Sequence, residues 1–110
     1  MFTRIRFFSS RSIRSIREAL EQPGRLIVDV RTPQEVARGG GCEGAVNIPI
    51  DEFQHRFSEL GSDKLKPIIF YCAKGIRSAD AVLLARSQGF TNVFNGVNGL
   101  EMKKLLASND

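Results

Sequence analysis

The sequence predicts an α/β fold in which an open, mostly parallel sheet has helices on both faces. Two observations predict it. Short apolar runs typical of buried strands alternate with segments of helical periodicity, and glycine or proline separates neighbouring segments. In such sheets, ligands bind at the carboxyl ends of the strands, close to the amino ends of helices. Side chains at that edge are therefore the first candidates for a functional site.

The first half of the chain contains two expected strands, each followed by a helix. Ser12–Leu20 has helical apolar spacing, and Leu26–Val30 is an apolar run around one acid, typical of a strand covered on both faces. Thr32 then begins a short helix with proline and glutamate at its first and third positions. Ala45–Ile48 is the second expected strand, and Asp51 caps the helix that follows it.

The second half repeats the alternation. Ile68–Cys72 is the strongest candidate for a central strand, and Ser78–Ser87 has the periodicity of a covering helix that Gly89 ends. Asn92–Phe94 is a further short strand, and a final helix runs from about Leu100 to Ala107.

Composition limits what the protein can bind. Its 110 residues suit one domain with its own core, and no apolar run is long enough for a transmembrane helix. The two cysteines, Cys42 and Cys72, are too few for a disulfide scaffold and lack the spacing of a metal site. We therefore expect a reducing compartment, no metal, no cofactor and no membrane partner.

The formal net charge of +4 is concentrated near the N-terminus. Residues 1–17 hold five arginines and no acid, so the rest of the chain has no basic excess, and a nucleic-acid partner is not expected. We divide the chain into a basic segment, residues 1–11, and a domain, residues 12–107. The basic segment has the composition of a mitochondrial targeting sequence, yet Arg4–Ser9 could also form an edge strand. We expect a mitochondrial location, with the cytoplasm as the alternative.

Cys72 is the candidate nucleophile, because it ends a buried strand and a short loop follows it. Gly75 lets that loop turn backbone N–H groups toward the sulfur, and the helix expected at Ser78 adds its positive end. Lys74 and Arg77 add full charges, so the pKa of the Cys72 thiol should lie below that of a free cysteine. A buried core cysteine is the alternative, but it leaves the cationic loop unexplained.

These segments, in this order and spacing, resemble a rhodanese-like domain. The resemblance rests on Leu26–Arg31, Thr32–Glu35, Glu43–Pro49 and Tyr71–Ser78, with Gly89-Phe90 before the last strand. It implies a five-stranded sheet in which Cys72 carries sulfur and Ala73–Arg77 surround the persulfide. The substrate-binding residues would then be Ala73, Lys74, Gly75, Ile76, Arg77 and Ser78.

The resemblance also implies a reaction. A donor such as thiosulfate or glutathione persulfide would pass sulfur to Cys72, and a thiol, cyanide or a sulfur-accepting protein would remove it. Two alternatives remain: a non-catalytic binding module, and a phosphatase or arsenate reductase of the same superfamily. The latter enzymes have a Cys-x5-Arg loop, whereas Cys72 and Arg77 are separated by only four residues.

The chain also departs from the family pattern. Cys42 stands on a glycine-flanked loop, where it could act as a resolving cysteine or an alternate sulfur acceptor; we favour the simpler interpretation that it only replaces the usual residue. Asn95–Gly99 replaces the usual glycine pair and tryptophan, so the rim of the pocket should differ. Asp29, Arg31 and Glu35 match family positions, and we interpret them as residues that brace loops.

Overall fold

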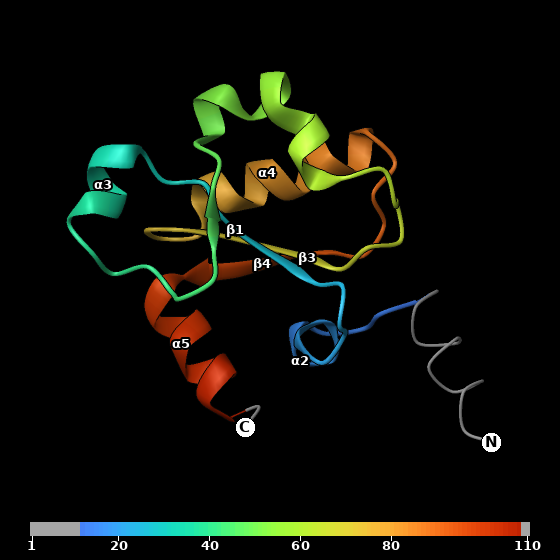
Figure 1. Cartoon of the computed structure of the whole chain (residues 1–110), viewed down its shortest axis with the longest axis horizontal. Coiled ribbons are helices and arrows are strands. Elements are labelled where there is room, and N and C mark those ends of the chain that lie inside the picture. Colours follow the sequence, from blue (N-terminus) through green and yellow to red (C-terminus); the bar gives the residue numbers. More distant parts are fainter. Residues whose placement is uncertain (1–11, 109–110) are drawn as a thin grey trace.

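The computed structural model describes residues 12–108, which form one parallel sheet between two layers of helices (Figure 1). The strands are hydrogen-bonded in the order β2-β1-β3-β4, and all three pairings are parallel. Their bounds are Leu26–Asp29 for β1, Val46–Asn47 for β2, Ile68–Cys72 for β3 and Val93–Asn98 for β4. The predicted α/β class is confirmed.

The predicted number of strands differs from what is seen. Residues 12–108 form a sheet of four strands rather than five. The edge strand considered at Arg4–Ser9 lies outside the described residues, as does the whole basic segment, residues 1–11.

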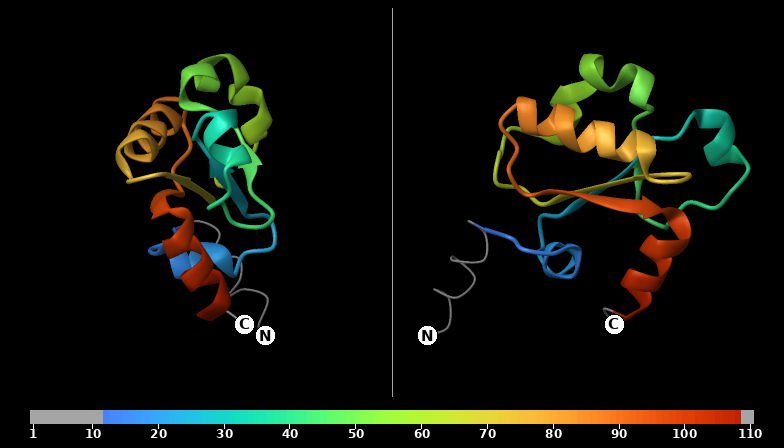
Figure 2. Two further views of the ribbon diagram at one scale, coloured as in Figure 1. Left: turned by 90° about the vertical axis from the view of Figure 1, so that its left-hand side faces the viewer. Right: turned by 180° about the vertical axis from the view of Figure 1, so that it is seen from behind.

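Helices cover both faces of the sheet. Helix α4 and the 3₁₀ segment η1 lie over one face, whereas α2 and α5 lie against the other (Figure 2). Helix α3 stands beyond the carboxyl ends of the strands, after β1 (Figure 1). The bounds are Ile16–Leu20 for α2, Pro33–Ala37 for α3, Ile50–Leu60 for η1, Ile76–Ser87 for α4 and Gly99–Ser108 for α5.

Strand β3 is at the centre of the core, and all five of its residues are buried. Successive side chains of a strand point to opposite faces. Phe70 and Cys72 therefore pack beneath α4 and η1, whereas Ile69 and Tyr71 pack against α2 and α5. This alternation places the two cysteines of the chain on different sides of the sheet, because Cys42 belongs to the Tyr71 cluster.

Two elements in the first half differ from the prediction. Strand β2 is shorter than Ala45–Ile48, although the N–H groups of Ile48 and Ile50, on either side of Pro49, still donate to the Asp29 and Val30 carbonyls. The helix expected from Asp51 is instead the 3₁₀ segment η1, which follows Pro49, has no side-chain cap and is kinked at Arg56. Its apolar spacing of three and four residues fits both kinds of helix, so periodicity could not separate them.

Two elements in the second half also differ. Helix α4 begins at Ile76 rather than Ser78, because Gly75 has a left-handed backbone (φ 94°) that turns the chain directly into the helix. Strand β4 continues beyond Phe94 to Asn98, with an irregular register around Gly96. A side chain at Gly96 would collide with Met102 of α5 and Ile69 of β3, so another residue would fit there only if these buried side chains moved.

Within residues 12–108, no helix combines the length and apolar character needed to cross a bilayer. The described chain also lacks any group of three or more His, Cys, Asp or Glu residues that could hold a metal ion.

Candidate active site

The site lies where β3 ends and α4 begins, at the carboxyl edge of the sheet. Cys72 is the last residue of β3 and is only 1% exposed. Above it is an open cavity of about 370 Å³, lined by Glu35, Cys72, Ala73, Lys74, Ile76 and Arg77. All predicted site residues except Gly75 and the buried Ser78 thus line one cavity. A molecule entering the cavity would meet the Cys72 sulfur at its wall.

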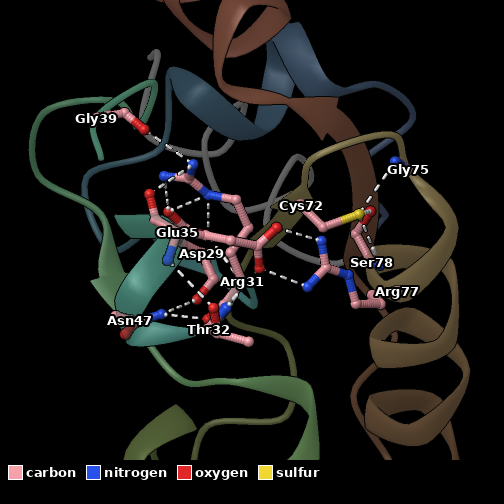
Figure 3. Close-up of polar contacts among 10 residues, drawn as sticks. All are labelled: Asp29, Arg31, Thr32, Glu35, Gly39, Asn47, Cys72, Gly75, Arg77 and Ser78. Carbon is pink, nitrogen blue, oxygen red and sulfur yellow. Dashed lines mark hydrogen bonds and ion pairs between the residues drawn. The ribbon is translucent and has the colours of Figure 1, made fainter. Parts of the chain in front are cut away.

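Three hydrogen-bonding groups converge on the Cys72 sulfur (Figure 3). The Gly75 N–H donates to Sγ at 3.0 Å, and the Ser78 N–H donates at 3.4 Å. The Ser78 hydroxyl lies 3.3 Å from Sγ. The left-handed turn at Gly75 makes this convergence possible, since it folds Ala73–Gly75 back over the sulfur before α4 starts.

These contacts determine the acidity of the thiol. Burial acts to raise the pKa of Cys72, but the Ser78 hydroxyl and the N–H groups of Ser78, Lys74 and Gly75 outweigh it, and the pKa is lowered to about 7. About half of the sulfur is then thiolate at neutral pH. Because the thiolate is the nucleophilic form, the geometry suits covalent catalysis by Cys72.

The cations contribute less to this acidity than the sequence suggested. Lys74 is exposed, and its backbone N–H rather than its ammonium group is among the main influences on the Cys72 pKa. The Arg77 guanidinium forms a bidentate ion pair with Glu35, at 2.7 and 2.9 Å. Much of its charge is therefore already balanced. Hydrogen bonds from the loop and from Ser78 are the larger influence.

Glu35 was interpreted as a loop brace, yet its carboxylate forms part of the cavity wall. Bonding to Arg77 is the largest influence on this carboxyl, and with the Thr32 N–H it lowers the pKa of Glu35 to about 2. Glu35 also closes the capping box of α3 with Thr32. The sequence showed the capping box, but the contact to Arg77 joins residues 42 positions apart and has no local signal.

Asn95 is a second residue that the sequence did not assign to the site. Its side chain accepts from the Ser78 hydroxyl at 2.7 Å and donates to the Gly75 carbonyl at 2.9 Å. Asn95 therefore connects β4 to Gly75 and Ser78, the two residues that bind the Cys72 sulfur. The replacement of the usual family residues at 95–99 was the only available signal.

Cys42 lies away from this site. It is buried among Tyr71 and residues of α2 and α5, on the face of the sheet opposite Cys72. Its backbone N–H donates to the Tyr71 hydroxyl at 2.9 Å, and burial raises the pKa of its thiol. The sheet separates the two sulfurs, so this arrangement favours the space-filling interpretation of Cys42 over a resolving role.

Asp29 and Arg31 form a buried ion pair of 2.8 Å, and both lie next to Gly41 and the Tyr71 hydroxyl, beside the Cys42 loop. Arg31 also donates to the Gly39 carbonyl at 3.0 Å and so holds the loop after α3 (Figure 3). This contact agrees with the interpretation of both residues as loop braces.

The fold and the site together define a class of protein: an α/β domain that holds an acidic cysteine at a strand end, inside a loop of N–H donors. Comparison with known proteins identifies the family. Residues 12–102 match the family model described as a rhodanese-like domain. The chain belongs to this family, whose members are in general sulfurtransferases.

Individual relatives support the assignment. A rhodanese domain-containing protein of Drosophila melanogaster is 30% identical over 89 residues, covering 71% of this chain and 80% of that protein. A mitochondrial thiosulfate sulfurtransferase of Saccharomyces cerevisiae is 36% identical over 89 residues, covering 70% of this chain but 60% of the yeast protein. The structure of a rhodanese from E. coli superposes with a TM-score of 0.63 at 28% identity, covering 70% and 89% of the two chains.

Other relatives carry different descriptions. A tRNA uridine(34) hydroxylase of Yersinia enterocolitica is 33% identical over 89 residues, which are 77% of this chain but 25% of that enzyme. A Rhodopseudomonas palustris structure described as a possible tyrosine phosphatase has a TM-score of 0.64 at 26% identity, covering 77% of this chain and 69% of that one. Family membership alone therefore does not fix the reaction.

Proposed function

We propose that this protein is a sulfurtransferase that carries a sulfane sulfur as a persulfide on Cys72. The observation that supports this most is the convergence of the Gly75 N–H, the Ser78 N–H and the Ser78 hydroxyl on a buried sulfur at the wall of a cavity. A persulfide places a second anionic sulfur in the same region. The donors that stabilise the thiolate would also stabilise this anion.

In the first half-reaction, the Cys72 thiolate attacks the outer sulfur of thiosulfate. A bond forms between Sγ and that sulfur, the sulfur–sulfur bond of thiosulfate breaks, and sulfite leaves with the electron pair. No general base is required at neutral pH, because the pKa of about 7 leaves about half of Cys72 already ionised.

In the second half-reaction, cyanide or a thiolate attacks the outer sulfur of the persulfide. The new bond takes that sulfur away, and the Cys72 thiolate leaves with the electron pair of the broken bond. The hydrogen bonds at Sγ stabilise this leaving thiolate, so the same contacts assist both half-reactions.

The substrates proposed are small or slender anionic donors, of which thiosulfate and glutathione persulfide are two. Lys74 is exposed at the cavity and provides a cation for such an anion, whereas Arg77 is engaged by Glu35. The acceptors proposed are cyanide, a low-molecular-weight thiol, or a thiol of another protein. A panel of donors and acceptors, each measured by kcat/KM, would identify the preferred pair.

The central test uses thiosulfate and cyanide with the full chain and with Cys72→Ser. The wild type should produce thiocyanate, and thiosulfate alone should add the mass of one sulfur atom to the Cys72 peptide. Cys72→Ser should lose both results. Thiocyanate production by the variant at the wild-type rate would refute the mechanism.

Two other functions would give different results. A binding module would acquire no sulfur from any donor, although the retained cysteine and its N–H loop argue against that role. A phosphatase or arsenate reductase would turn over an aryl phosphate or arsenate as fast as it transfers sulfur. The loop of four residues between Cys72 and Arg77, and the pairing of Arg77 with Glu35, favour sulfur over a tetrahedral oxyanion.

For the location, we propose delivery to mitochondria. The five arginines and absence of acids in residues 1–17 support this, and the yeast relative named above is mitochondrial. A fluorescent protein fused behind residues 1–20 should accumulate in mitochondria. A uniform cytoplasmic signal would contradict the proposal.

A further inference from the structure

The Ser78 hydroxyl has two neighbours and only one proton to donate. Its oxygen lies 3.3 Å from the Cys72 sulfur and 2.7 Å from Asn95 Oδ1. Ser78 is fully buried, so the choice lies between these two groups within the protein. The position of this proton bears on the site, because the hydroxyl is the only rotatable donor among the three groups at the sulfur.

The orientation of the Asn95 amide is fixed by its other contacts. Its Nδ2 donates to the Gly75 carbonyl at 2.9 Å, and its Oδ1 accepts from the Val97 N–H, also at 2.9 Å. Exchanging nitrogen and oxygen would place two acceptors together at Gly75 and two donors together at Val97. Asn95 therefore presents an acceptor to Ser78, and the 2.7 Å contact requires the Ser78 proton.

The charge on the sulfur changes this arrangement. As a neutral thiol, Cys72 can donate its own proton to Ser78 Oγ while Ser78 donates to Asn95. As a thiolate, Cys72 has no proton and becomes a strong acceptor, since hydrogen bonds to ions are stronger than neutral ones. Asn95 Oδ1 would keep the Val97 N–H after the hydroxyl turned away. No buried acceptor would then be left without a donor.

We propose that Asn95 is a positioning residue that holds the Ser78 hydroxyl proton while Cys72 is a thiol and releases it to the sulfur when the thiolate or persulfide forms. Only a rotation of the hydroxyl is involved, and the proton lost by Cys72 goes to solvent. Asn95 thus competes with the sulfur for one proton. The proposal extends the function proposed above, but it concerns an ionisation that can be measured without any sulfur donor.

Among the charged groups near Cys72, the Arg77 guanidinium also interacts with the sulfur, and it is present in every variant of the test below. Lys74 belongs to the loop, and Arg77 of α4 is paired with Glu35 of α3. Asp29, the last residue of β1, is paired with Arg31, and both lie next to Gly41 and the Tyr71 hydroxyl, on the other face of the sheet from Cys72. Strand β4 brings no ionisable side chain to the sulfur, and Asn95 is neutral. Its influence on Cys72 can therefore pass only through the groups that it binds, the Ser78 hydroxyl and the Gly75 carbonyl, and the Ser78→Ala background separates these two routes.

The test is a double-mutant cycle with Asn95→Ala, Ser78→Ala and the double variant. The rate of Cys72 alkylation by iodoacetamide is followed across pH, with the modified peptide identified by mass spectrometry. Ser78→Ala should raise the apparent pKa by about one unit, because a donor to the thiolate is lost. Asn95→Ala should lower it by about half a unit, a threefold gain in thiolate at acidic pH. In the Ser78→Ala background, Asn95→Ala should produce no such decrease.

Asn98→Ala is the matched control. Asn98 lies in the same strand, but its Oδ1 accepts from the Glu101 N–H at 2.8 Å, at the start of α5. This variant should leave the alkylation profile unchanged in both backgrounds. If Asn95→Ala does not fold, Asn95→Val removes the same acceptor with a residue that favours strands.

The proposal would be overturned if Asn95→Ala left the apparent pKa of Cys72 unchanged or raised it, or if it lowered the pKa equally with and without Ser78. In each case Asn95 would not act through the hydroxyl. Thiocyanate formation is measured in parallel on the same samples. Sulfur transfer by the wild type without the coupling would refute only the role of Asn95. The coupling without any sulfur transfer would refute only the proposed function.

Discussion

The acidity of Cys72 should make the folded protein more stable as the pH rises, by an amount that the structure allows us to calculate. In the folded chain the pKa of Cys72 is about 7, whereas in the unfolded chain it should have the ordinary value of about 8.5. A lowered folded-state pKa stabilises the protein above the unfolded value, and this stability is lost as the pH falls through the folded one. The contribution should be near zero at pH 6 and about 2 kcal/mol at pH 9.

Cys72→Ala provides the comparison, because it removes this titration and leaves the others. The free energy of unfolding of both proteins is measured by urea denaturation under reducing conditions at several pH values. Cys42 and Tyr71 have raised pKa values and should destabilise the fold at high pH, but they do so equally in both proteins. The difference between the two proteins therefore isolates Cys72.

Between pH 6 and pH 9, the free energy of unfolding of the wild type should rise by about 2 kcal/mol relative to that of Cys72→Ala, and most of this rise should occur between pH 7 and pH 8.5. Removing the sulfur from the core also changes stability by an amount that does not depend on pH, and this amount cancels when the values at two pH values are subtracted. A difference that stays the same across this range would refute the reasoning. In that case the hydrogen bonds at the sulfur would not favour the thiolate, and the mechanism would need a general base.

Three further variants test other contacts of the site. Glu35→Gln should lower the free energy of unfolding by about 1 kcal/mol at pH 7, because it breaks a half-buried bidentate ion pair with Arg77. This loss should shrink as the pH falls below the pKa of Glu35 in the unfolded chain and vanish near pH 2; a loss that does not change with pH in denaturation experiments would contradict this. Gly75→Ala should strain the left-handed turn by about 1–2 kcal/mol and displace the N–H that donates to the Cys72 sulfur, so thiocyanate formation should fall about tenfold. Activity equal to that of the wild type would show that the turn is dispensable. Cys42→Ala should keep sulfur transfer within about twofold, since the sheet separates it from Cys72, and a complete loss would show that the two thiols cooperate.

The fold was readable from the sequence wherever local pattern and burial agree. The runs at β1 and β3, the capping box of Thr32 and Glu35, and the final helix were all predicted to within two residues at each end. Each depends on signals within a few positions of the chain. The 3₁₀ segment η1 was not predicted as such, because its apolar spacing also fits an α-helix.

The extension of β4 was missed for a different reason. Asparagine and glycine at positions 95 and 96 are poor strand formers, so the local signal ends at Phe94. The neighbouring strand β3 pairs with this segment as far as Asn98, and the register shift accommodates Gly96. Tertiary hydrogen bonding thus overrides local preference in this segment.

In the site, too, the locally encoded features were predicted and the long-range contacts were not. Cys72 and its loop were predicted, because a buried run ending in Cys with glycine three residues later is a local pattern. The residues that contact this loop from elsewhere in the chain were not predicted: Glu35 meets Arg77 from 42 residues away, and Asn95 meets Ser78 from 17. The cations visible in the sequence drew attention to charge, whereas the acidity arises mainly from oriented N–H and O–H groups.

The source of this acidity has a consequence for specificity within the family. Fixed ammonium groups beside the sulfur would favour the thiolate but would also hold any anionic substrate or leaving group strongly. N–H donors at 3.0 and 3.4 Å are directional, and they act on the sulfur itself rather than on the whole cavity. With Arg77 balanced by Glu35, the cavity keeps Lys74 as the exposed cation among its lining residues. Under the function proposed above, a donor anion would then bind weakly, react, and release sulfite without being trapped.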